Sequence, residues 1–116
     1  MTYGDIEGRP DFKKGIASLY KSISPEEIVP THGASGANHH IFYSLVQPGD
    51  RVISIMPTYQ QLYSIPESLG ADVKVMHLTK ENGYLPDLEE LKRLALPGVK
   101  VICLNNPNNP TGALMS

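Results

Sequence analysis

The sequence lacks the features that would place it in several large classes of protein. It has one cysteine, Cys103, so no internal disulfide can form, and this usage fits the reducing cytoplasm. Ten Lys and Arg nearly balance twelve Asp and Glu, which leaves a net charge of −2 and no basic cluster for nucleic acid. No apolar run could span a bilayer, and residues 1–5 do not begin a signal peptide. We therefore expect a cytoplasmic protein that binds neither nucleic acid nor membrane.

Common catalytic motifs are missing as well. There is no Gly-x-Ser-x-Gly motif, no pair of acids with a clear acid/base logic, and no P-loop or dinucleotide fingerprint. His39 and His40 are adjacent within a predicted helix, so they point in different directions and cannot chelate one metal together. Cys103 lies in an apolar run, which is typical of a small buried hydrophobic residue rather than a catalytic thiol.

The sequence does contain alternating strand-like and helix-like segments. Its 116 residues, 41% hydrophobic and 19% charged, have the composition of one globular domain. Apolar runs at residues 51–56, 72–78 and 99–104 predict strands, with a short extended run at 28–31. Apolar residues three and four apart predict helices between them. This alternation predicts an α/β fold with a mainly parallel sheet covered on both faces.

Capping residues and apolar spacing place the helices. Asp11 is predicted to cap a helix that runs to Tyr20, and Asp87 one that runs to Leu94. A helical pattern from Leu62 contains Pro66, which predicts a kink or a late start. The first helix is marked by an apolar set at spacings of three and four: Phe12, Ile16, Leu19 and Tyr20. The helix after the small-residue loop 33–37 is expected to bury Ile41, Phe42, Leu45 and Val46.

Three segments are expected beyond the carboxyl ends of strands, where α/β sheets bind ligands. The loop 33–37 could present backbone N–H groups and a helix N-terminus to a phosphate, or could simply be a well-capped tight turn. Tyr59 could stack on a heteroaromatic ring, or could pack at the surface. Asn109 lies in the segment 105–112, where prolines fix the backbone and asparagines supply neutral donors and acceptors.

Taken in order, these segments resemble the class I and II aminotransferases, fold type I enzymes that depend on pyridoxal phosphate. The resemblance covers essentially the whole chain. It implies that residues 1–116 are part of the large, cofactor-binding domain, a three-layer α/β/α structure with a mainly parallel sheet. Five features carry it: Tyr3 five residues before Gly8, Thr31–Ser35, Gln47–Asp50, Pro57–Tyr59 and Asn109–Gly112.

The resemblance also implies roles for particular positions. Six residues match the family's cofactor-binding positions: Gly33, Ala34, Ser35, Tyr59, Asn109 and Tyr3. The first three would hold the phosphate of pyridoxal 5'-phosphate through backbone and hydroxyl donors. Tyr59 would stack on the pyridine ring, and Asn109 would hydrogen-bond the phenolic oxygen of that ring. Tyr3 would reach the phosphate of the neighbouring subunit in a homodimer.

Other parts of the family pattern lie outside this sequence. In the family, the Schiff-base Lys, the Asp that pairs with the pyridine nitrogen, and the arginines for phosphate and substrate all follow the Asn-Pro-Thr-Gly segment. The family's leading segment, which belongs to its small domain, would precede residue 2 of this sequence. We therefore expect a fragment without a catalytic residue, inactive alone. The expected reaction of the full-length enzyme is amino-group transfer between an amino acid and a 2-oxo acid. A C–S lyase, decarboxylase or synthase of the same fold, or a truncated non-catalytic chain, are the alternatives.

The resemblance has a consequence for stability. In the family's seven-stranded sheet, the strand before the glycine loop lies at the far edge from the other three strands found here. The run 28–31 is therefore expected to lack its normal neighbours. Unpaired parallel edges expose backbone donors and apolar faces, so the chain alone is predicted to be poorly stable, oligomeric or rearranged.

Overall fold

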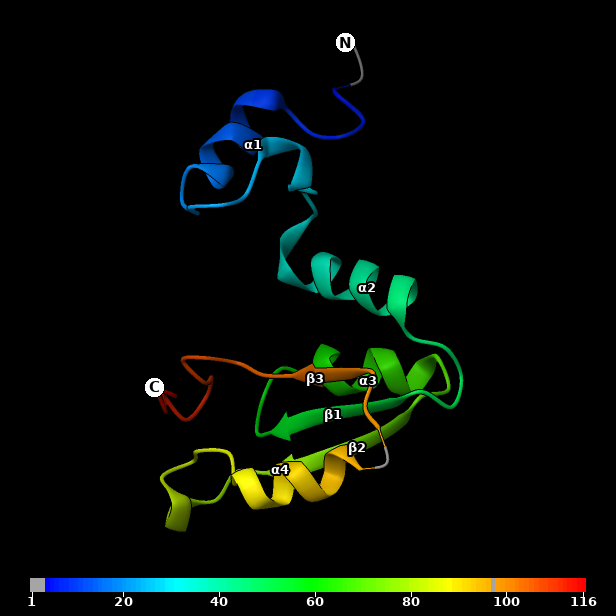
Figure 1. Cartoon of the computed structure of the whole chain (residues 1–116), viewed down its shortest axis with the longest axis vertical. Helices are drawn as coiled ribbons and strands as arrows, with labels where there is room; N and C mark the ends of the chain where they lie inside the picture. The colour runs from blue at the N-terminus through cyan, green and yellow to red at the C-terminus, as the bar shows by residue number, and fades with distance from the viewer. Residues whose placement is uncertain (1–3, 97) are drawn as a thin grey trace. The chain divides into compact units, whose positions relative to one another are not determined.

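The computed structural model describes residues 4–96 and 98–116 and divides the chain into two compact units. The first unit comprises residues 1–37 and the second unit residues 38–116, with the boundary inside helix α2 (Gly33–Leu45). Figure 1 shows the order of the elements along the chain. None of the helices in the described part of the chain is long and apolar enough to cross a membrane.

Helix α1 (Pro10–Ala17) in the first unit begins two residues earlier than the sequence predicted. Arg9 occupies the N-cap position and Pro10 follows it at the first helical position, where its fixed φ suits the helix. Asp11 is therefore not the cap. Its carboxylate accepts a hydrogen bond from Arg9 Nε at 3.1 Å, and this contact holds the pKa of Asp11 below its ordinary value.

The same helix also ends earlier than predicted, and this changes which side chains it buries. Leu19 and Tyr20 lie beyond Ala17 and are exposed. Phe12 is exposed as well, Ile16 is half-buried, and only Ala17 is fully buried. The prediction that this helix runs to Tyr20 is wrong, and a helix of two turns does not include all four residues of the apolar set.

The run 28–31 is not a strand in the structure; it follows a short 3₁₀ helix, η1 (Pro25–Glu27). A strand requires a lateral partner for its backbone groups. The run is packed instead against a glycine: Gly8 has φ +88°, and a Cβ added to it would lie 2.3 Å from Pro30 Cγ. Glycine at position 8 thus permits both the left-handed backbone and the close approach to Pro30.

The second unit contains a parallel sheet of three strands, in the order β2-β1-β3 (Figure 1). The strands are β1 (Arg51–Met56), β2 (Asp72–His77) and β3 (Val101–Cys103). All three were predicted, and β3 is shorter than the run 99–104. Val52 is paired with Val73 on one side and with Val101 on the other, so β1 is central.

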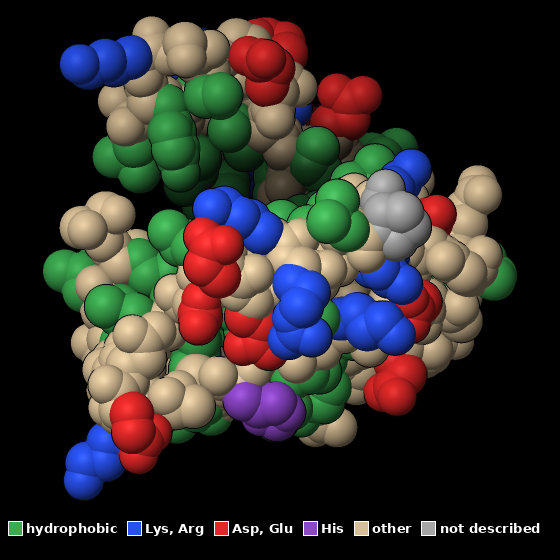
Figure 2. Space-filling model, turned by 60° about the horizontal axis from the view of Figure 1, so that its bottom comes forward, with side chains coloured by type: hydrophobic (Ala, Val, Ile, Leu, Met, Phe, Trp, Pro, Cys, Tyr) green, Lys and Arg blue, Asp and Glu red, His purple; other side chains and the backbone are tan. Residues whose placement is uncertain are grey.

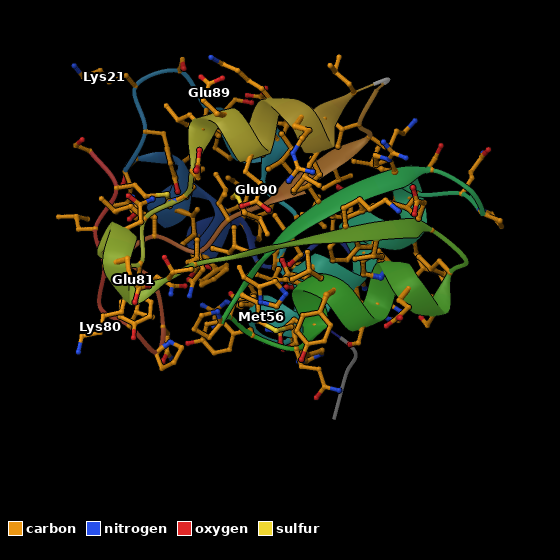
Figure 3. The ribbon with its side chains drawn as sticks, turned by 90° about the horizontal axis from the view of Figure 1, so that it is seen from below. Lys21, Met56, Lys80, Glu81, Glu89 and Glu90 are labelled. Atoms are coloured by element: carbon orange, nitrogen blue, oxygen red, sulfur yellow. The ribbon has the colours of Figure 1, made fainter. Side chains whose placement is uncertain are left out.

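Helices cover both faces of β1, which explains its four consecutive buried residues. Seen from below, α3 (Gln61–Ser68) and α4 (Leu88–Ala95) lie on opposite sides of the strands (Figure 3). On one face Val52 packs with side chains of α2 and α3, and on the other Ile55 packs with side chains of α4. The second unit therefore has the predicted three-layer α/β/α arrangement. The two clusters are Phe42, Val46, Val52, Leu62 and Cys103, and Ile55, Met76 and Leu78 with Leu91 and Leu94 against them.

The two helices on the first face confirm part of the predicted pattern. Phe42 and Val46 are buried, but Ile41 and Leu45 are half exposed, so α2 presents a narrower apolar face than predicted. Helix α3 has no late start: Pro66 lies inside it and is buried. The missing N–H of a proline costs one helical hydrogen bond, and burial of its ring against the core offsets part of that loss.

Helix α4 begins at the predicted cap. Asp87 Oδ1 accepts hydrogen bonds from the backbone N–H groups of Glu89 at 2.8 Å and Glu90 at 3.2 Å. Glu89 extends away from the sheet, whereas Glu90 lies nearer to the strands (Figure 3). Acidic and basic side chains are interspersed on the surface around this helix (Figure 2), and Lys92 pairs with Glu89 at 2.6 Å. The turn before α4 contains a 3₁₀ helix, η2 (Lys80–Asn82).

Charged side chains join the amino ends of β1 and β2. Asp72 pairs with Lys74 at 2.7 Å and with Arg51 at 2.9 Å. The contact with Lys74 contributes most, and that with Arg51 next, to holding the pKa of the Asp72 carboxyl below its ordinary value. Arg51 Nη1 also donates to the carbonyl of Leu96 at 2.5 Å. These charged pairs of the sheet therefore lie at its amino edge.

Candidate functional site

Two loops meet at the carboxyl edge of the sheet. Strand β1 ends at Met56, labelled in Figure 3, and its parallel neighbour β3 ends at Cys103. The segment after β1, residues 57–60, is called here the β1 loop, and residues 105–112 the asparagine loop. Because the two strands are parallel and adjacent, both loops start from the same edge, where α/β sheets bind ligands. The sequence predicted this placement.

A direct hydrogen bond joins the two loops. Asn109 Nδ2 donates to the Tyr59 hydroxyl oxygen at 2.7 Å. The Tyr59 side chain is 47% exposed, so one part of its ring surface is open to a ligand. The sequence predicted that Tyr59 and Asn109 lie at the same edge, and the structure brings them into contact. A contact across fifty positions of sequence could not be found from local patterns.

Asn108 is a residue that the sequence did not single out. It is only 5% exposed. Its Nδ2 donates to Thr111 Oγ1 at 2.8 Å and to the carbonyl of Pro57 at 3.3 Å, and its Oδ1 accepts from Asn105 Nδ2 at 3.3 Å. Residue type alone gave no signal, because four asparagines occur in this loop and the carbonyl partner is 51 positions away.

The rest of the asparagine loop is held by its own backbone and by a glycine. The N–H of Gly112 donates to the carbonyl of Asn108 at 2.7 Å, and Gly112 has φ +74°, which favours glycine. Asn106 exchanges two hydrogen bonds with the backbone of Met115, at 3.2 and 2.9 Å. The peptide bonds Met56–Pro57, Asn106–Pro107 and Asn109–Pro110 are cis.

The predicted phosphate residues form the first turn of α2. Gly33, Ala34 and Ser35 are exposed, and the first N–H groups of a helix have no acceptor within it. The Gly33 N–H, however, donates to the carbonyl of Thr31 at 3.1 Å, which leaves Ala34 and Ser35 as the backbone donors. These residues belong to the first unit, whereas Tyr59 and Asn109 belong to the second. Tyr3 lies outside the described residues.

The groups of the second unit fit a flat aromatic ring with an oxygen substituent, and those of the first unit fit an anion such as a phosphate. The half-exposed Tyr59 ring offers a stacking surface. Among the described residues, the carboxamide of Asn109 hydrogen-bonds only to the Tyr59 hydroxyl, so one N–H and Oδ1 are open to a ligand. The first turn of α2 has no acidic residue that would repel an anion. Thr58 Oγ1, beside Tyr59, is buried without a protein partner in the described part of the chain.

Comparison with known proteins identifies what the chain is similar to. Residues 1–116 match the family described as "Aminotransferase class I and II". The chain is 37% identical to transaminase BacF of Bacillus subtilis and 31% identical to the aspartate/prephenate aminotransferase of Thermus thermophilus, over 97% of its own length in both cases. A pyridoxal-phosphate-dependent aminotransferase of Streptococcus suis 89-1591 has a similar crystal structure, with a TM-score of 0.93 and 58% identity over 98% of the chain.

The chain spans about 30% of the length of these relatives: 30% of BacF, 30% of the Thermus enzyme and 30% of the Streptococcus chain. The match includes the asparagine loop, the β1 loop and the first turn of α2, because it extends over nearly the whole chain.

Proposed function

Because this chain belongs to the class I and II aminotransferases, we propose that the whole protein transfers an amino group between an amino acid and a 2-oxo acid, with pyridoxal 5'-phosphate as its cofactor. One observation in the chain itself carries the proposal: the 2.7 Å hydrogen bond between Asn109 Nδ2 and the Tyr59 hydroxyl, at the carboxyl edge of the sheet. It places a stacking ring beside a neutral amide donor, the two groups that a pyridine ring with a phenolic oxygen requires.

Pyridoxal phosphate supplies an electron-withdrawing ring that stabilises negative charge on the carbon bearing the amino group. The residues of this chain would bind and orient it. The exposed ring of Tyr59 would cover one face of the pyridine ring, and Asn109 would donate its open N–H to the phenolic oxygen. The N–H groups of Ala34 and Ser35, with the Ser35 hydroxyl and the small Gly33, would hold the phosphate.

The orientation of the Asn109 carboxamide determines which of its groups can reach the cofactor. One of its two N–H groups is bonded to the Tyr59 hydroxyl, so the side chain is fixed while the second N–H remains available. A neutral donor stabilises a negatively charged oxygen through a charge-assisted hydrogen bond. Tyr59 therefore has two roles in the proposal, as a stacking surface and as the anchor of the donor.

The proposal also covers the organisation of the whole protein. Residues 1–116 would be part of the large, cofactor-binding domain, and the lysine that binds the cofactor covalently would come from a later segment. A homodimer in which Tyr3 reaches the partner subunit's cofactor phosphate is part of the same hypothesis. The cytoplasmic location inferred from the single cysteine stays a prediction.

Cofactor binding is the first test. The protein is expressed with the coding sequence that follows residue 116 in its source, and pyridoxal phosphate is titrated into the wild type and into Asn109→Ala and Tyr59→Ala variants. Each substitution is expected to weaken binding, Asn109→Ala by about tenfold or more, as expected for a lost hydrogen bond to a charged oxygen. Tyr20→Ala is the matched control, because Tyr20 is an exposed tyrosine of the first unit outside the proposed site.

The reaction is tested with the same preparation. A panel of amino acids is incubated with a 2-oxo acid, and the new amino acid is measured. Transfer of the amino group supports the proposal. Release of carbon dioxide or of a thiol without transfer would identify a different reaction of the same cofactor, and a wild type that does not bind pyridoxal phosphate would refute the proposal altogether.

A further inference from the structure

We propose that Asn108 is a positioning residue, whose buried carboxamide ties the asparagine loop to the β1 loop and thereby holds Asn109 against the Tyr59 hydroxyl. The inference rests on the proposed function in one respect: the pair that Asn108 positions is the pair assigned to the cofactor ring. The positioning itself is a property of the protein without any ligand.

Two hydrogen bonds run side by side between the loops. Asn108 Nδ2 donates to the carbonyl of Pro57 at 3.3 Å, and Asn109 Nδ2 donates to the Tyr59 hydroxyl at 2.7 Å. Their donors are consecutive residues of one loop, and their acceptors lie two residues apart on the other. The first bond is made by a buried side chain and the second by an exposed one, so the buried bond fixes the frame in which the exposed bond forms.

The orientation of the Asn108 carboxamide is determined by its partners. Both of its N–H groups are used, one by Thr111 Oγ1 and one by the carbonyl of Pro57, and its oxygen accepts from Asn105. A flipped carboxamide would place its oxygen against the carbonyl of Pro57, where two acceptors repel. The side chain thus has one satisfied orientation, and that orientation links the two loops.

Loss of this link would be transmitted to the Tyr59–Asn109 pair. Because Asn108 is buried, little water can replace its amide. Removing the amide would leave the carbonyl of Pro57 without a hydrogen-bond donor, and the β1 loop would shift until the carbonyl gains another one. Tyr59 is only two residues further along the chain. Hydrogen bonds weaken steeply as distance and angle depart from the optimum, so a small shift of the β1 loop is enough to break the 2.7 Å contact.

Asn106 provides a matched control within the same loop. It is also an asparagine, and its side chain is exposed. In the described structure its carboxamide forms hydrogen bonds only with the backbone of Met115 and none with the β1 loop. Asn106→Ala therefore removes two local hydrogen bonds without touching the β1 loop. A difference between Asn106→Ala and Asn108→Ala separates positioning of the pair from general loosening of the loop.

The experiment compares Asn108→Ala, Asn108→Asp and Asn106→Ala in the full-length protein. Asn108→Asp keeps the volume and the acceptor for Asn105 but has no N–H for Pro57, so it tests the donor even if the alanine variant does not fold. Crystal structures without ligand report the distance from Asn109 Nδ2 to the Tyr59 hydroxyl. Titration with pyridoxal phosphate reports the cofactor affinity, and circular dichroism reports the fold.

Both Asn108 variants are expected to lose the Tyr59–Asn109 hydrogen bond while the sheet is retained, and to bind pyridoxal phosphate about tenfold more weakly, as the loss of one buried hydrogen bond predicts. Asn106→Ala should keep the contact and the affinity. An intact 2.7 Å contact in Asn108→Asp would overturn the inference. If the wild type does not bind pyridoxal phosphate, the proposed function fails, but the ligand-free structures still decide whether Asn108 positions the pair.

Discussion

Four asparagines within five positions of the chain have different roles because they have different partners. Asn105 donates to Asn108, Asn106 closes its own loop through Met115, Asn108 reaches the carbonyl of Pro57, and Asn109 donates to a tyrosine hydroxyl. Their side-chain chemistry is identical. Burial and the identity of the acceptor distinguish the two that join the loops from the two that act within one.

Cys103 allows a prediction about pH at the same scale. Its side chain is 6% exposed, and burial raises the pKa of the thiol from 9.0 to about 11. Between these values the unfolded chain loses the thiol proton and the folded chain keeps it. The free energy of unfolding should therefore be unaffected by this group below about pH 8.5 and should fall as the pH rises through 9 toward 11, by up to about 3 kcal/mol.

The measurement is urea denaturation from about pH 8 to about pH 10.5 of the wild type and of Cys103→Ala. The alanine variant is less stable throughout, because it leaves a small cavity beside Val52, but it should lose less stability over this pH range. The difference between the two pH profiles isolates the contribution of the thiol. Parallel pH profiles would show that the thiol ionises in the folded state as readily as in the unfolded one.

At the scale of single elements, two aspartates were predicted to cap helices and only one does. The side chain of Asp87 accepts hydrogen bonds from two N–H groups at the start of α4. Asp11 follows Pro10, whose fixed φ and missing N–H are best placed at the first helical position, so the helix begins before Asp11 can cap it. Aspartate is a good N-cap residue in both places, but in α1 the proline takes the first helical position and the N-cap position falls to Arg9.

Asp87→Ala should therefore lower the free energy of unfolding by about 1 kcal/mol, the usual effect of removing an N-cap side chain. Asp87→Asn keeps an oxygen acceptor and should lose only a fraction of this. Chemical denaturation of the three proteins measures the difference. An asparagine variant as unstable as the alanine variant would mean that Asp87 acts through its negative charge at the helix N-terminus and not through the hydrogen bonds to Glu89 and Glu90.

At the scale of the whole molecule, the sheet has an open side. Among the described residues, β3 is paired only with β1, and Ile102 and Leu104 in this edge segment are 41% and 48% exposed. An unpaired strand edge with apolar side chains is a site where another chain can add. We therefore predict that the isolated 116-residue chain self-associates through β3.

Ile102→Lys should shift the isolated chain toward the monomer, because a charge on an edge strand opposes pairing. Leu88→Lys is the control, since Leu88 is exposed on α4 and lies outside the sheet. Size-exclusion chromatography with light scattering gives the masses. A monomeric wild type with one sharp thermal transition would contradict this prediction.

The sequence by itself determined the class of fold and the placement of the β1 loop beside the asparagine loop. Apolar runs and turns mark the three strands, and because parallel strands end at a common edge, the sequence predicts that the β1 loop and the asparagine loop lie together. The sequence did not predict the length of the helix in the first unit or the burial of its side chains. Whether Phe12 or Leu19 is covered depends on where a helix stops and on what packs against it.

Only the tertiary structure decided which atoms meet within the site. The hydrogen bonds from Asn109 to Tyr59 and from Asn108 to Pro57 join residues about fifty positions apart. Local sequence patterns carry information over the few residues of a turn or a helix, whereas these contacts follow from the pairing of β3 with β1 and from burial of a single carboxamide between their loops.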